Sequence, residues 1–200
     1  TTDIYTVYKS SAASDVYKRQ DTMLSTLRRL NRLIAYLVGV VLMGCVVFVL
    51  ADIVLRQLGS SLGGTDEISG YVMAIATAWG MGFTLIELGH VRIDILRCRT
   101  PAPGRAIFDL VAMLALAGTV TLIAIRGWPV LSRSLANSSR ANTPLETPLA
   151  LVQAPWLAGW VWFAIVAWLT FIAALLLILQ TDFAKADKAI GTFGELDALK

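Results

Sequence analysis

Four long runs without a charged residue most constrain what this chain can fold into. They cover residues 33–51, 68–86, 110–125 and 149–179. A helix needs about 20 apolar residues to cross about 30 Å of hydrocarbon, and each run approaches or exceeds that length, the third with its flanks. None shows the ten-residue alternation of a membrane β-barrel. The sequence therefore predicts an all-α integral membrane protein with four transmembrane helices, at about residues 31–58, 66–88, 105–135 and 156–179.

Composition and helix length support this prediction. Hydrophobic residues make up 56% of the chain, more than an ordinary soluble domain contains. At 1.5 Å per residue the third predicted helix would be about 45 Å long, so we expect long helices that tilt or project beyond the bilayer.

The distribution of Lys and Arg predicts the orientation of these helices. Most of them lie in the N-terminal segment, in the link at 89–105 and in the C-terminal tail, whereas the opposite side receives only a few. Those few are Arg56, Arg126, Arg133 and Arg140. By the positive-inside rule, both termini and the link are predicted to be cytoplasmic. The net charge of +3 is then a consequence of topology, and it gives no reason to expect a nucleic-acid partner.

The ends of the chain differ from its middle. Residues 1–22 are polar, show no helical period and precede Met23, which a basic segment and an apolar run follow. We interpret residues 1–22 as a non-native or disordered leader. Residues 23–180 are predicted to form the four-helix domain, and residues 181–200 a polar cytoplasmic tail.

The turn between the first two helices carries several candidate contacts. Asp52 and Arg56 are spaced to form an i,i+4 pair on one face of the first helix. Thr65 is predicted to cap the second helix, and Asp66 and Glu67 fall in its first turn, where acidic side chains are favourable.

Small residues recur every four positions along the second helix. Such a ridge lets two helices approach closely in lipid, where packing by dispersion brings them together. We therefore predict a packing face, which we call the small-residue ridge. Its members are Gly70, Ala74, Ala78 and Gly82.

The segment at 137–155 contains three prolines and is predicted to be an ordered loop that leads into the fourth helix. Four tryptophans near the predicted outer boundary would form an aromatic belt. They are Trp128, Trp156, Trp160 and Trp162. Trp168 would lie too deep for the belt and is predicted to pack against another helix.

The side chains that carry catalysis or bind metals are sparse. His90 is the single histidine, and Cys45 and Cys98 lie in different segments, so we expect neither a metal site nor a bound haem nor a disulfide. No nucleophile motif occurs. The sequence predicts a protein that is not an enzyme, takes no cofactor and serves a partner.

The stretch VLADIVLRQLGSSLGGTDEISGYVMAIATAWGMGFTLIELGHVRIDIL, at residues 49–96, resembles the DctQ-type small membrane subunit of tripartite ATP-independent periplasmic (TRAP) transporters. The resemblance covers roughly residues 24–180 and includes the Thr/Pro-rich approach to the fourth helix. In one departure, Gly63 and Gly64 precede the acidic pair where the family often has an aromatic residue. The residues that carry the resemblance are Arg56, Asp66, Glu67, Trp79, Gly80, Gly82, Gly89, His90, Arg92 and Asp94.

The resemblance implies a subunit of a secondary transporter in the bacterial inner membrane. A periplasmic solute-binding protein would deliver a small organic acid or similar solute to a large TRAP permease subunit, which moves it inward with sodium. The small subunit would enlarge the scaffold against which the permease moves, without binding the solute. His90, Arg92 and Asp94 would then be structural or subunit-facing contacts, with Arg92 also near lipid headgroups.

Two other functions remain open from the sequence. A stand-alone four-helix proton-coupled exporter would use Asp52 or Glu87 as its coupling carboxylate. The chain could also be a structural subunit of another tripartite membrane transport complex.

Overall fold

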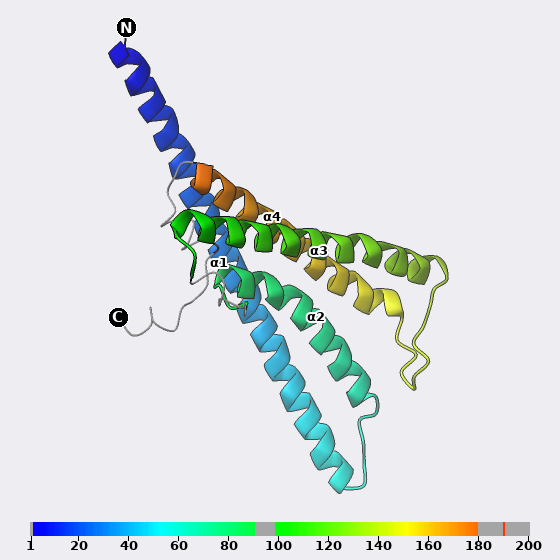
Figure 1. Cartoon of the computed structure of the whole chain (residues 1–200). Helices are drawn as coiled ribbons and strands as arrows, with labels where there is room; N and C mark the ends of the chain where they lie inside the picture. The colour runs from blue at the N-terminus through cyan, green and yellow to red at the C-terminus, as the bar shows by residue number, and fades with distance from the viewer. Residues whose placement is uncertain (1, 91–98, 180–189, 191–200) are drawn as a thin grey trace.

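A computed structural model describes residues 2–90, 99–179 and 190. It contains four helices, α1 (Thr2–Gln57), α2 (Thr65–Ile86), α3 (Ala102–Ala136) and α4 (Leu149–Leu179) (Figure 1). Among the described residues there is no strand beyond a single bridge between Arg140 and Pro148. All four helices are long and apolar enough to cross a membrane, so the predicted all-α fold with four spans is confirmed.

All four helices begin earlier than predicted, and two of them, α1 and α4, by seven residues or more. α1 starts at Thr2 rather than near residue 31. Residues 2–38 contain neither glycine nor proline, so no helix-breaking residue separates the N-terminal segment from the apolar run. α4 starts at Leu149 and continues through Pro155, so residues 149–155 are helical and not part of a loop. Pro148 precedes the first turn, in which the Leu151 N–H donates to the Pro148 carbonyl (3.0 Å). The apolar run that begins at residue 149 thus marks the helix start better than the prolines do.

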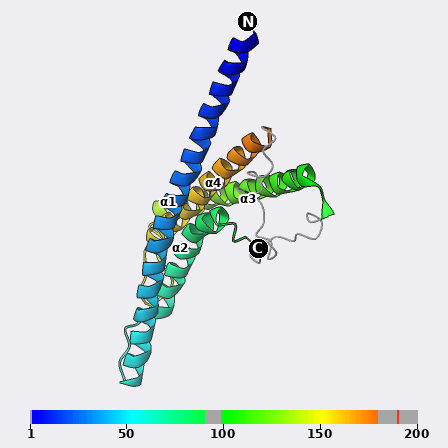
Figure 2. The same cartoon turned by 90° about the vertical axis from the view of Figure 1, so that its left-hand side faces the viewer.

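The helices form an open layer in the order α1, α2, α4, α3. The main contacts join α1 to α2, α2 to α4 and α4 to α3, and α1 touches α4 only at a few positions. The two hairpins diverge away from the end at which they meet (Figures 1 and 2). Because the hairpins are not parallel, both cannot stand upright in one bilayer. At least one pair of long helices is therefore tilted.

The buried core lies where the two hairpins meet. We call the end of the layer where the hairpins meet the inner end, and the opposite end the outer end. The core joins the inner halves of α3 and α4 to the inner end of α2 and to α1 at Leu27, near the middle of that helix. Its largest members include Leu85, Met113, Phe163 and Val166. Away from this core the helices bury little: α1 exposes large apolar side chains at intervals from Leu30 to Val54. An open layer leaves such faces to lipid or to a partner.

Candidate packing and subunit-contact sites

A buried carboxylate holds the turn that follows α1. Asp52 is only 2% exposed, and its Oδ2 accepts a hydrogen bond from the Arg56 Nε at 2.7 Å. Its Oδ1 accepts from the Ser61 hydroxyl (3.1 Å) and from the Leu62 backbone N–H (2.8 Å). The predicted Asp52–Arg56 pair is confirmed. Both carboxylate oxygens are therefore engaged in closing the α1–α2 turn, while half of the Arg56 side chain stays exposed.

We predict that Asp52→Ala lowers the melting temperature of the purified protein by a few degrees, because the Ser61 hydroxyl, the Leu62 N–H and Arg56 all lose their acceptor. Thermal unfolding in detergent measures this. Glu146→Gln is the matched control, since Glu146 is an exposed acid in the α3–α4 loop. An equal shift in both variants would mean that the turn does not depend on Asp52.

The two acidic residues in the first turn of α2 have different surroundings. Asp66 is exposed. The Glu67 Oε1 accepts a hydrogen bond from the Tyr71 hydroxyl at 2.6 Å. The Glu67 Oε2 is buried and accepts no hydrogen bond from the described residues. The hydrogen bond that Glu67 accepts therefore lies within α2, while Asp66 points outward.

Gly64, and not Thr65, occupies the cap position of α2. Gly64 adopts a left-handed conformation (φ 65°), and no side chain caps the helix. The predicted Thr65 cap is wrong because Thr65 is already the first helical residue, and it is 3% exposed. The Leu145 side chain from the α3–α4 loop packs where a Gly64 Cβ would be. Glycine is needed here both for its backbone conformation and for this contact.

Only one half of the small-residue ridge is buried. Ala78 and Gly82, its inner half, are buried against α4, whereas Gly70 and Ala74 are exposed. Nothing lies within 4 Å of a Cβ built on Gly70. The inner half of the ridge therefore packs within this chain, and only the outer half is open to another molecule.

α2 and α4 approach each other closely at Gly159. A Cβ at this position would lie 2.8 Å from the Ala78 Cβ and 3.0 Å from the Ala78 carbonyl carbon. One turn away, the Trp79 Nε1 donates to the Pro155 carbonyl oxygen at 2.9 Å. The two helices are thus held together by a close backbone contact and by one hydrogen bond.

A second junction joins three helices around Asn31, a residue that the sequence did not single out. Asn31 is fully buried: its Nδ2 donates to the Leu27 carbonyl (2.9 Å), and its Oδ1 accepts from the Trp162 Nε1 (3.2 Å). A Cβ at Gly82 would lie 2.9 Å from the same Oδ1. In the sequence Asn31 stands beside Arg32 in a basic segment, so nothing distinguished this amide from its exposed polar neighbours.

The tryptophans only partly follow the predicted belt. Trp128 is 61% exposed near the outer end of α3, as a belt residue would be. Trp162, however, is bonded to Asn31, and Trp160 packs against Phe163 with ring centroids 6.1 Å apart, so the belt assignment is wrong for these two. Trp168 packs against another helix as predicted, since its Nε1 donates to the Thr121 hydroxyl at 2.9 Å.

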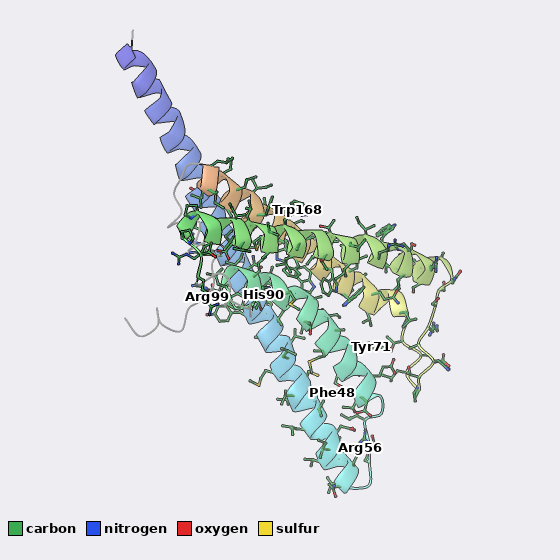
Figure 3. All side chains as sticks on the ribbon, viewed as in Figure 1. Phe48, Arg56, Tyr71, His90, Arg99 and Trp168 are labelled. Atoms are coloured by element: carbon green, nitrogen blue, oxygen red, sulfur yellow. The ribbon has the colours of Figure 1, made fainter. Side chains whose placement is uncertain are left out.

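His90 lies just beyond the inner end of α2, at the opposite end of the α1–α2 hairpin from Arg56 (Figure 3). Its ring stacks on Phe163 of α4, with centroids 6.1 Å apart and planes 21° apart. This placement is that of a packing residue at the core. Arg92 and Asp94 lie outside the described residues.

Two apolar grooves lie along the seam between α1 and α2. One has a volume of about 290 Å³ and lies at mid-helix, with Val38 and Trp79 among its lining residues. The other has a volume of about 250 Å³ and lies toward the outer end, with Cys45 and Met73 among its lining residues. Almost no polar atom lines either groove, so neither could bind a polar solute.

Comparison with known proteins adds a single finding to this geometry. A protein-family model described as "Tripartite ATP-independent periplasmic transporters, DctQ component" matches residues 45–177. The matched residues begin in the second half of α1 and end near the end of α4, so they include part or all of each helix. No significant match was found among curated proteins or solved structures.

Proposed function

This chain belongs to the DctQ family of tripartite ATP-independent periplasmic transporter components, and on that premise we propose that it packs against a large permease subunit as a scaffold. The resemblance found in the sequence is thereby confirmed. With its four spanning helices, the protein is a multi-pass protein of the bacterial inner membrane. The transport that it serves would be sodium-driven uptake of a small organic acid or similar solute, delivered by a periplasmic binding protein.

The observation that carries this proposal is the open helical layer. A four-helix chain that worked alone would be expected to close into a bundle around its site. Here the helices form a layer whose apolar faces remain open, and the contacts along it are packing contacts. These features support a subunit that extends a larger membrane protein.

We also propose an orientation of the chain in the membrane. Arg28, Arg29 and Arg32 lie at the end of the layer where the hairpins meet, and we place this end at the cytoplasmic side. Arg56 lies in the last turn of α1 and Arg133 in the last turn of α3. These are the ends at which the hairpins diverge (Figure 1), and they would face the periplasm. Both termini would then be cytoplasmic.

The role of Asp52 supports a scaffold over a proton-coupled exporter. A coupling carboxylate must release and rebind a proton during transport. Asp52 instead accepts three hydrogen bonds within the outer turn, one of them from Arg56. Glu87, the other candidate for a coupling carboxylate, is exposed at the end of α2 and is not enclosed by the helices.

Co-purification tests the proposed partnership. The tagged chain, extracted from its native membrane, is expected to bring with it a permease of about a dozen helices in stoichiometric amount. Recovery of the chain alone under mild extraction, together with solute transport by the chain alone, would contradict the proposal.

The exposed half of the small-residue ridge is the part of α2 that we propose for contact with the permease. Ala74→Leu is expected to lower co-purification at least about fivefold, because a bulky side chain would separate two close helices. The melting temperature of the isolated chain should stay unchanged, since Ala74 is exposed. Ala78→Leu would also reduce assembly, but it would do so by disturbing the contact with Gly159.

Gly118→Leu serves as the comparison, since Gly118 is exposed on α3 with nothing within 4 Å of its Cβ position. If Gly118→Leu lowers co-purification while Ala74→Leu does not, the permease docks on α3 and the proposed contact at the ridge is wrong.

A further inference from the structure

Three arginines form an exposed cationic cluster near the inner end of the spanning part of α1. Arg28, Arg29 and Arg32 are all exposed. Among the residues whose side chains the structure describes, none forms an ion pair with them. Three guanidinium groups within five residues repel one another, so a site of this kind favours an anion.

The fold fixes the direction of this cluster, and its position along α2 indicates its depth. Leu27 and Asn31 face the other helices and are buried, so the arginines at 28, 29 and 32 are turned away from the layer. Asn31 is tied to Trp162 and lies against Gly82, one turn before α2 ends at Ile86. Measured along α2, the cluster therefore lies level with the end of a membrane-spanning helix, which we take as the level of the lipid headgroups.

An apolar stripe continues from the cluster along the same side of α1. Arg29 and Arg32 are followed by Tyr36, Val40 and Met43, spaced by four and three residues. Tyr36 is 69% exposed, Val40 71% and Met43 66%. Cations at headgroup level above an exposed apolar stripe are complementary to a phospholipid with an anionic headgroup.

We propose that Arg28, Arg29 and Arg32, together with the stripe that begins at Tyr36, form a binding site for an anionic phospholipid. Its phosphate accepts hydrogen bonds from the guanidinium groups, and an acyl chain lies along the stripe. A protein partner on this face would need to supply buried acidic groups for three arginines, whereas lipid phosphates meet them at the membrane surface. This face of α1 is then a lipid face, and the permease docks elsewhere on the layer.

Lipid selectivity of the full-length chain tests this site. The chain is reconstituted in phosphatidylcholine bilayers that contain a trace of spin-labelled phosphatidylglycerol or spin-labelled phosphatidylcholine. The fraction of motionally restricted label gives the ratio of the two association constants. We expect phosphatidylglycerol to be preferred about fivefold or more at low salt, because one arginine near the surface contributes about this factor. The triple variant R28Q/R29Q/R32Q should bring the ratio close to one.

The matched control replaces three exposed arginines at the other side of the membrane, R126Q/R133Q/R140Q, and should retain most of the preference. Circular dichroism establishes that both variants keep the helical content of the parent. The proposal is wrong if the inner triple variant keeps the parent's ratio, or if the outer variant loses as much. The proposal is also wrong if R28Q/R29Q/R32Q and the parent chain have the same lipid ratio when each is bound to the permease. The permease would then cover the cluster. The measurement on the isolated chain does not depend on the proposed transport function.

Discussion

Gly159→Leu is expected to separate α2 from α4 and to lower the stability of the chain by about 3 kcal/mol, at the upper end of the usual cost of overpacking. A Cβ at Gly159 would lie 3.0 Å from the backbone carbonyl carbon of Ala78 and 3.0 Å from the Trp79 Cδ1. Backbone cannot rotate away as the end of a flexible side chain can, so α2 itself has to move. That movement would also break the hydrogen bond from Trp79 to the Pro155 carbonyl.

Thermal unfolding of the purified chain in one detergent measures this effect. Gly118→Leu introduces the same side chain into a membrane helix at a position with nothing within 4 Å, and we expect almost no change in its melting temperature. Equal melting temperatures for the two variants would show that α2 and α4 are not in close backbone contact at Gly159.

The sequence was sufficient for features that are local in the chain. Uncharged runs of membrane length predicted four helices, and the spacing of Asp52 and Arg56 predicted their ion pair. Both depend on neighbours along one helix, where the geometry is fixed by 3.6 residues per turn. The family match confirms the resemblance that the outer turn and α2 indicated.

Contacts between distant residues could not be predicted in the same way. Gly159 is one of several glycines in apolar runs, and only the fold shows that it meets Ala78. Asn31 looked like the start of a helix and is instead the buried centre of a three-helix junction.

The tryptophan error has a specific cause. The fourth helix was expected to start at residue 156 and starts at Leu149, seven residues and about 10 Å earlier. Trp160 and Trp162 therefore lie about three to four turns inside α4, too deep for an outer belt. The misplaced start came from giving Pro155 more weight than the apolar residues before it, although a proline can be accommodated within a membrane helix.

The largest functional effect is expected when the chain is removed from the proposed transport system. An open layer with exposed apolar faces is suited to extend the fixed part of a permease. Without it, the permease would lose its scaffold. We therefore expect uptake to fall to background in the absence of this chain, although the binding protein still captures solute. Gly159→Leu should show a large part of the same loss, because it disrupts the layer.

Uptake by membrane vesicles tests the central claim most directly. Vesicles from cells that produce the permease with or without this chain receive the purified binding protein loaded with its labelled solute, under an inward sodium gradient. The account predicts sodium-dependent accumulation only when the permease, the binding protein and this chain are all present. Accumulation that is undiminished without this chain, or accumulation in vesicles that contain this chain without the permease, would contradict it.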